Sequence, residues 1–186
     1  MPDFTASSPI PIETRYKGYR FRSRLEARWA VFFDTIGRDW RYEEQGFKLP
    51  SGRCYLPDIF VQEWRAHIEI KPNSLTETEQ GAYLGILGEL EDLGVRTMLI
   101  AGSPWPGEYS IWRPWFDEDG DSCHLGPLVF AYDRRDANVL TLVGDYFWGP
   151  LDRPGTTHDR FPIPHDGLDH AYHAARGARF EHGECG

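Results

Sequence analysis

The sequence predicts a single α/β domain in which helices flank a mixed sheet. Three observations support this fold class: an amphipathic helical stripe, two short strand patterns with charged side chains, and a helix that leads into an apolar strand. At 186 residues, with 40% hydrophobic and 15% aromatic side chains, the chain is large enough to bury one core. We therefore expect the order helix, three strands, helix, strand.

The first helix follows a loose arm at residues 1–14. Apolar residues recur at helical spacing up to Gly37, namely Phe21, Leu25, Trp29, Phe32, Phe33 and Ile36. Glu26 borders this stripe, so it can reach from the helix to a sheet edge. Two alternatives stay open. Ser23 and Glu26 fit a capping box, in which Glu26 bonds the Ser23 amide; a helix that starts near Arg20 leaves Glu26 free for a site.

Three strands are expected next, at 40–49 with a turn at 50–52, at 55–61 and at 66–71. In the third strand His67, Glu69 and Lys71 alternate with apolar residues, so they share one face. Asp58, on the neighbouring strand, would complete a group of two carboxylates and one ammonium. Two carboxylates suit a hard divalent cation, and a lysine suits negative charge developing on phosphate.

A blander interpretation of these residues is also open. Asp58, which follows Pro57, could be only a turn or strand-start residue. Glu69 and Lys71 could be an exposed ion pair on an edge strand, which contributes little to stability. The order and context of all three residues favour a metal site.

The second helix is expected over 77–93, because Thr76-x-x-Glu79 has the form of a capping box. Its inward residues would be Tyr83, Leu84, Leu87, Leu90 and Leu93. Gly94 ends the helix, and the apolar run 95–101 predicts a buried strand. Residues 103–186 are expected to form a β-rich extension packed on the core, with strands at 110–116, 128–132 and 139–147, a loop at 149–164 and a closing helix at 166–180.

The net charge of −9 weighs against a nucleic-acid partner, but the charge is unevenly distributed. Residues 13–28 carry six basic side chains against two acidic ones. The phosphate contacts that we expect there are Lys17, Arg20, Arg22 and Arg24. Such contacts would give weak, salt-sensitive binding to bulk duplex. Trp105, Trp112, Trp115 and Phe116 could stack on bases, although dense rings more often form core.

Other features limit the compartment and the class of protein. The three cysteines are widely spaced, with no Cys-x-x-Cys pair, so neither a disulfide framework nor a zinc ribbon is expected. The chain has no apolar run of the roughly 20 residues that a membrane span needs. The N-terminus lacks a signal sequence. We therefore expect a cytoplasmic protein with no membrane partner.

Leu56-Pro57-Asp58, Glu69-Ile70-Lys71, the helix acid Glu26 and the order of elements together resemble the PD-(D/E)xK nuclease superfamily, which has the restriction-endonuclease-like fold. Residues 19–29 also resemble the first helix of small phage and bacterial members. The resemblance covers residues 15–102. Gln80 and Tyr83 are one residue too close for the Gln-x-x-x-Tyr motif of the recombination exonucleases, so this branch is not assigned.

The resemblance implies a restriction-endonuclease-like core and an endonuclease that cuts DNA, duplex or branched, with Mg²⁺ or Mn²⁺. Asp58, Glu69 and the Ile70 carbonyl would bind the metal, and Glu26 would orient a water or bind a second ion. Lys71 would orient the attacking water or stabilise the phosphate charge. Two alternatives are a nucleic-acid-binding or assembly subunit that depends on a protein partner, and an RNA-directed nuclease. A homodimer is a further expectation.

Overall fold

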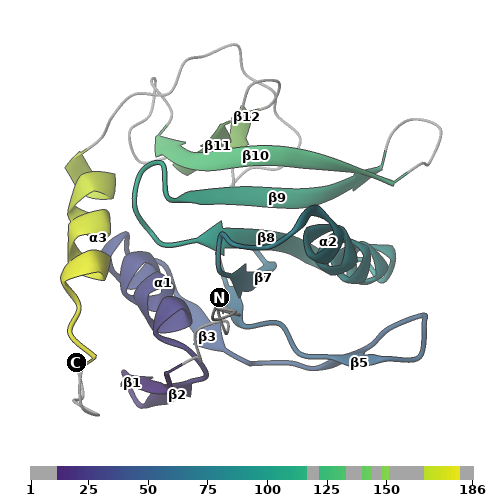
Figure 1. The fold of residues 1–186 in the computed structure, drawn as a ribbon, viewed down its shortest axis with the longest axis horizontal. Helices are drawn as coiled ribbons and strands as arrows, with labels where there is room; N and C mark the ends of the chain where they lie inside the picture. Colours follow the sequence, from purple (N-terminus) through teal and green to yellow (C-terminus); the bar gives the residue numbers. More distant parts are fainter. Residues whose placement is uncertain (1–11, 117–121, 133–139, 144–147, 151–165, 181–186) are drawn as a thin grey trace, which may run out of the picture.

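The computed structural model describes residues 12–116, 122–132, 140–143, 148–150 and 166–180. One eight-stranded mixed sheet crosses the fold in the order β12-β11-β10-β9-β8-β7-β6-β3 (Figure 1). Two small strand pairs, β1-β2 and β4-β5, lie outside it. Together with three helices, this arrangement confirms the mixed α/β class.

The first half of the chain contains β1 (Thr14–Tyr16), β2 (Tyr19–Phe21), α1 (Arg24–Thr35), β3 (Trp40–Tyr42), β4 (Phe47–Lys48), β5 (Cys54–Tyr55), β6 (Ile59–Val61), β7 (Ala66–Lys71) and α2 (Glu77–Asp92). The second half contains β8 (Arg96–Gly102), β9 (Tyr109–Phe116), β10 (Ser122–Tyr132), β11 (Leu140–Val143), β12 (Trp148–Pro150) and α3 (Asp166–Gly177).

The strands β7 and β8 are parallel, whereas β6 and β7 are antiparallel. A parallel pair needs a long crossover, and α2 provides it. Because β6 and β7 run in opposite directions, the start of β6 and the end of β7 lie at the same end of the strand pair, which we call the sheet edge. This edge brings Asp58, just before β6, beside Glu69 and Lys71.

The two faces of the sheet pack against different helices. Side chains alternate along β8, so Met98 and Ile100 join the core under α1 and α3, whereas Leu99 packs with Leu84 and Leu87 of α2. His67, Glu69 and Lys71 alternate with Ile68 and Ile70 and therefore face the α2 side.

The start of α1 decides between the two alternatives for Glu26. Ser23 is the N-cap, and its hydroxyl accepts a hydrogen bond from the Glu26 amide at 3.2 Å. The helix therefore begins at Arg24, and a start near Arg20 is wrong. Phe21 belongs to β2 instead of the helix.

Three details of the expected elements are wrong. Residues 40–49 form two strands in different sheets, because the chain leaves β3 and turns back through the β4-β5 hairpin. Residues 55–61 are likewise split between β5 and β6 by Leu56, Pro57 and Asp58; Leu56 is 39% exposed. Leu93, expected inward, is 50% exposed, because it follows the last turn of α2.

The strands after residue 102 extend the same sheet. β9 pairs with β8, and β10 pairs with both β9 and β11. Phe130 stacks on Phe32 of α1 with ring centroids 5.5 Å apart, and Tyr109 shares a hydrogen bond with Tyr172 of α3. These contacts continue the core of residues 15–102 into the extension.

Some expectations lie outside the described residues, including the arm at 1–11, parts of the strand at 139–147 and most of the loop at 149–164, whose first two residues belong instead to β12. The side chains of Trp115 and Phe116 are also outside them. Trp105 packs against the α1 core, and Trp112 against the α2 cluster. Among the described helices, none combines the length and the apolar character that crossing a bilayer requires.

Candidate functional site

The candidate site begins where β6 and β7 separate. Their ladder ends at the pair Ile59 and Ile68, before Ile70 is reached. The Ile70 amide therefore has no strand partner on that side. It donates a hydrogen bond to Oδ2 of Asp58 at 2.8 Å, which fixes this carboxylate at the sheet edge. Asp58 is only 1% exposed.

Glu69 and Lys71 complete the group that the sequence predicts. The Lys71 ammonium contacts Oε1 of Glu69 and lies 3.7 Å from Oδ2 of Asp58. It also donates to the Ile70 carbonyl at 3.2 Å. Glu69 is 4% exposed, whereas the Lys71 side chain is 21% exposed. The ammonium is thus the member of the trio that solvent reaches most easily.

Arg22 is a second cation at this edge. Its Nη2 atom is 2.8 Å from Oδ1 of Asp58 and 2.9 Å from Oε1 of Glu43. Glu43 follows β3 in a left-handed conformation, with φ of 47°, and its amide bonds the Asp58 carbonyl at 2.9 Å. Non-glycine residues held in this region carry backbone strain, which is often found at functional sites.

Glu26 is buried beside the trio, but its oxygens are already bonded. Oε1 accepts from the Ser23 hydroxyl at 2.7 Å, and Oε2 accepts from the Tyr42 hydroxyl at 2.7 Å and the Arg22 amide at 3.1 Å. Glu26 thus holds the turn that carries Arg22, which is a positioning role. The capping-box alternative is correct in one part: Ser23 caps the helix. In the other part it is wrong, because the Glu26 carboxylate accepts a hydrogen bond from the Arg22 amide instead of the Ser23 amide.

Sequence reasoning missed Tyr42. Its hydroxyl accepts from the Arg22 amide at 3.1 Å and donates to Glu26, so it links β3, α1 and the site. Burial raises the pKa of Tyr42, and the bond to Glu26 adds to this shift, so the hydroxyl stays a donor. Only its alternation with Trp40, inward on the same short strand, could have suggested a buried position.

The charges of the trio are strongly interdependent. Burial raises the pKa of Asp58 to about 7, and the Glu69 carboxylate adds to this shift while the Lys71 ammonium opposes it. Burial disfavours the Lys71 ammonium, but Asp58 and Glu69 outweigh it and raise the lysine pKa. The Lys71 ammonium therefore stabilises the charged form of Asp58 against burial.

Tyr55 of β5 covers Glu69 and gives the best test of metal fit. The Tyr55 hydroxyl and Oε2 of Glu69 are both buried, and neither makes a hydrogen bond of ordinary geometry with a described residue. The hydroxyl faces the Glu69 carboxylate, which adds to the rise that burial causes in the pKa of Tyr55. A carboxylate oxygen with only this weak contact, beside a second carboxylate and the Ile70 carbonyl, is a donor set that suits Mg²⁺ or Mn²⁺.

Within the described part of the chain, no three His, Cys, Asp or Glu side chains converge as a ready metal cluster. Two carboxylates and a carbonyl leave several positions for water, which Mg²⁺ usually retains. The types of donor therefore suit one hard cation bound partly through water, and the Lys71 ammonium now contacts all three of them.

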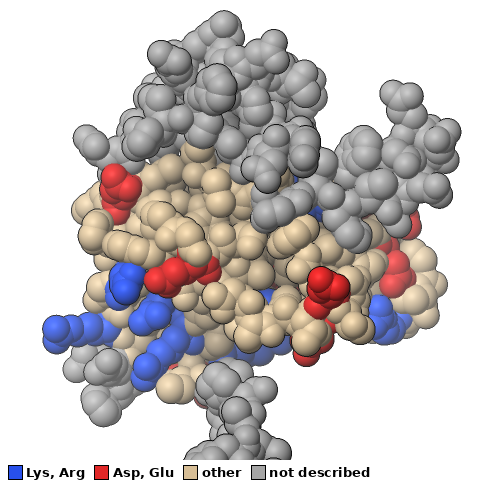
Figure 2. Space-filling model, turned by 45° about the horizontal axis from the view of Figure 1, so that its top comes forward, with Lys and Arg blue, Asp and Glu red and all other residues tan. Residues whose placement is uncertain are grey.

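The remaining expected nucleic-acid contacts lie farther from the trio. Lys17 pairs with Asp34 at 2.7 Å, and Arg20 pairs with Glu13. Arg24 lies in the first turn of α1, on the same helix face as Arg28. Figure 2 shows Lys and Arg side chains gathered at its lower left, in the region of α1 and the β1-β2 pair.

Comparison with family models and with curated proteins finds no match to this chain.

Proposed function

We propose that the protein is a metal-dependent nuclease that hydrolyses phosphodiester bonds in DNA. One observation carries the proposal: two buried carboxylates and a lysine ammonium meet where β6 and β7 separate, and one carboxylate oxygen makes no hydrogen bond of ordinary geometry. Neither a core nor a surface ion pair needs this arrangement, because a buried acid without enough donors costs stability.

The order of elements supports the restriction-endonuclease-like core as part of the proposal. A helix, three strands of the main sheet, the crossover helix α2 and the parallel strand β8 follow one another, with Asp58 before β6 and Glu69-x-Lys71 at the end of β7. The strands β9 to β12 and α3 would then be additions to this core.

Each residue of the site has a role in this proposal. Asp58, Glu69 and the Ile70 carbonyl would hold Mg²⁺ or Mn²⁺, and the metal when bound would acidify a water and neutralise phosphate charge. Lys71, already beside both carboxylates, would donate to a non-bridging phosphate oxygen. Arg22 balances the charge of Asp58, and its side chain is exposed enough to contact a DNA strand. Glu26 and Tyr42 hold the Arg22 backbone in place.

A second candidate is a nucleic-acid-binding or assembly subunit on the same fold. It is favoured by the fact that both Asp58 oxygens are engaged, one by Arg22 and one by the Ile70 amide. In this candidate the site is a structural network, and the net charge of −9 is balanced by a basic partner.

Cleavage assays separate the two candidates. Supercoiled plasmid and labelled duplex, single-stranded and branched oligonucleotides are incubated with Mg²⁺, Mn²⁺ or EDTA. We expect wild-type cleavage with either metal, and loss of more than about 100-fold for Asp58→Asn and Lys71→Met, which remove a metal ligand and a phosphate donor. Exposed matched controls, Asp39→Asn and Lys48→Met, should retain activity.

Two results would contradict the proposal that the protein is a metal-dependent nuclease. The first is wild-type activity no greater than that of Asp58→Asn on every substrate. The second is cleavage that survives in EDTA. A labelled RNA of the same sequence distinguishes DNA from RNA as the substrate.

A further inference from the structure

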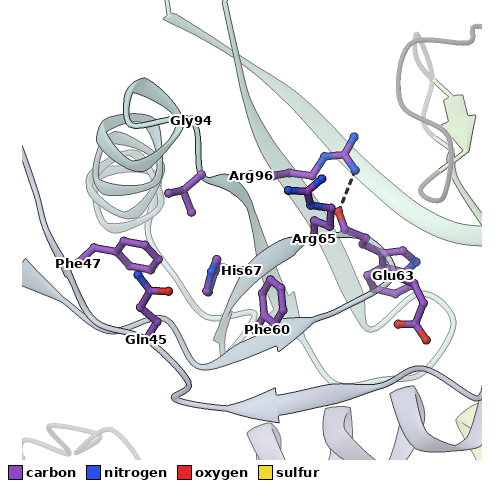
Figure 3. A pocket seen from close by; sticks show the side chains of 10 residues that line it. Gln45, Phe47, Phe60, Glu63, Arg65, His67, Gly94 and Arg96 are labelled. Carbon is purple, nitrogen blue, oxygen red and sulfur yellow. Dashed lines mark hydrogen bonds between the residues drawn. The ribbon is translucent and has the colours of Figure 1, made fainter.

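A pocket of about 700 Å³ lies at the end of β7 that is farther from Lys71 (Figure 3). Its wall combines the rings of Phe47, Phe60 and His67 with the arginines Arg65 and Arg96, and we call it the aromatic–arginine pocket. It lies between the C-terminal end of α2, the strand β4 and the turn that joins β6 to β7. Its volume is within the range of small-ligand sites.

The rings of the pocket are fixed against one another. His67 packs on Phe60 with ring centroids 4.7 Å apart and meets Phe47 edge-on at 5.0 Å. His67 is buried, whereas Phe47 and Phe60 are partly exposed. A buried ring that supports two partly exposed ones forms a rigid platform for stacking another planar group.

The Arg96 guanidinium and the Arg65 main chain each make a hydrogen bond to a backbone carbonyl. Arg96 donates from Nη1 to the Trp64 carbonyl at 3.1 Å. Arg65 lies at the end of the β6-β7 turn with φ of 49°, and its amide bonds the Gln62 carbonyl at 3.1 Å. A glycine would adopt this conformation without strain, so an arginine here supplies an exposed guanidinium at a cost in backbone energy.

The combination narrows the chemistry of the ligand. An apolar ligand would not pair with two guanidinium groups, and a bare anion would not stack on three rings. A planar ring joined to a phosphate uses both, because bases stack on aromatic side chains and arginine binds phosphate oxygens with paired donors. Gln45, exposed at the rim, adds an amide that can donate and accept.

We propose that the aromatic–arginine pocket binds an unpaired nucleobase and its adjoining phosphate, from the strand that is cut at Asp58, Glu69 and Lys71. The inference rests on the nuclease proposed above. His67 and Lys71 share the α2 face of β7 four residues apart, or about 13 Å. This span is about four nucleotides of a stacked strand. The pocket thus favours single-stranded or frayed DNA over intact duplex.

The test uses full-length protein and a 12-residue oligothymidylate with one 5-iodouracil, in EDTA so that no metal-dependent cleavage occurs. Two variants remove different parts of the pocket: Phe60→Leu keeps the apolar volume but loses the ring, and Arg65→Gly suits the left-handed backbone but loses the guanidinium. Arg179→Ala removes an exposed arginine elsewhere as the matched control. Circular dichroism checks that all three fold.

We expect each pocket variant to raise the oligonucleotide Kd by about 5- to 150-fold, the range for loss of one stacked base, with the control unchanged. Irradiation should crosslink the iodouracil to Phe47, Phe60 or His67. In cleavage assays the variants should raise KM and leave kcat within about twofold, since they remove binding without touching the reacting phosphate.

The outcomes separate this inference from the nuclease itself. Wild-type cleavage with unchanged Kd in both variants, or with crosslinks only outside the pocket, overturns the pocket assignment and leaves the nuclease standing. Crosslinks in the pocket without any cleavage support the assignment and refute the chemistry. Displacement of the oligonucleotide by equimolar thymidine monophosphate overturns the strand assignment, since a free nucleotide would then be the ligand.

Discussion

The substitution Lys71→Met tests whether the carboxylates of the site depend on a cation. In the wild-type protein the Lys71 ammonium contacts Glu69 and lies 3.7 Å from Oδ2 of Asp58. The same ammonium lies 5.0 Å from the centroid of the Tyr83 ring. Methionine keeps the chain length and packs well on an aromatic ring, so the substitution removes mainly the charge.

The magnitude follows from the geometry. At an effective dielectric constant of about 20, one ion pair at this distance is worth roughly 4 kcal/mol before desolvation is counted. Removing one partner of a buried pair typically costs about 3–5 kcal/mol. We therefore expect Lys71→Met to lower the free energy of unfolding by about 3 kcal/mol at pH 8 in EDTA. For a chain of this size, that is a fall in Tm of about 6–12 °C.

The pH dependence has a definite sign. The folded-state pKa of Asp58 is raised to about 7, so the stability contributed by its protonated form is present at low pH and lost as pH rises towards 7. Without the ammonium, this pKa rises further and a proton can replace the missing cation. The destabilisation by Lys71→Met should therefore be smaller at pH 6 than at pH 8.

Metal should rescue the variant. A cation that binds only the folded state adds about 1.4–2.7 kcal/mol to the free energy of unfolding when its concentration is 10 to 100 times its Kd. In Lys71→Met the ammonium no longer competes with this cation for the carboxylates. Urea denaturation at pH 6 and 8, with EDTA or Mg²⁺, measures all three effects, with Lys48→Met as the control. A variant as stable as wild type at pH 8, or one that Mg²⁺ stabilises no more than wild type, would refute the reasoning.

Four further changes test the surrounding structure by the same denaturation assay. Tyr42→Phe removes the hydroxyl that bonds a buried α1 carboxylate at 2.7 Å and should cost about 1–3 kcal/mol; no loss would contradict its positioning role. Gly102→Ala should cost more than about 4 kcal/mol, because φ is +111° and the new Cβ would lie 2.0 Å from the Glu108 carbonyl oxygen. Gly81→Ala, in a helix with open space, should instead stabilise by up to about 1 kcal/mol. Phe130→Ala should cost about 3–5 kcal/mol if the extension shares the core, and a cost below about 1 kcal/mol would indicate a separate unit.

The order of the helices and sheet strands was predictable because it depends on local patterns. Alternation of apolar and charged residues along 66–71 predicts β7, and the capping box at Thr76 predicts the start of α2, where both of its hydrogen bonds form. Leu84, Leu87 and Leu90 are buried as their spacing requires. Leu93 follows the same spacing but lies past the helix end, where periodicity no longer applies.

What the sequence could not predict depends on contacts between distant residues. Arg22 and Asp58 are 36 positions apart, and their ion pair exists because the turn before α1 lies against the start of β6. The sequence suggested Arg22 as a phosphate contact from local charge alone. Tyr42 was missed for the same reason, since a single aromatic in a three-residue strand carries no signal for a role in a network.

The balance of charges at the sheet edge favours a functional site over a structural network. A network retained for stability would satisfy its buried polar atoms, because each orphan costs about 1–3 kcal/mol. Here Oε2 of Glu69 and the Tyr55 hydroxyl are both buried, and neither makes a hydrogen bond of ordinary geometry with a described residue, although the hydroxyl faces the Glu69 carboxylate. Burial and Glu69 raise the pKa of Asp58 to about 7, although the Lys71 ammonium and the Ile70 amide favour its charged form. An apolar pair at these positions would pack without those costs. Reduced stability of this kind is expected of a site that binds a cation and a phosphate.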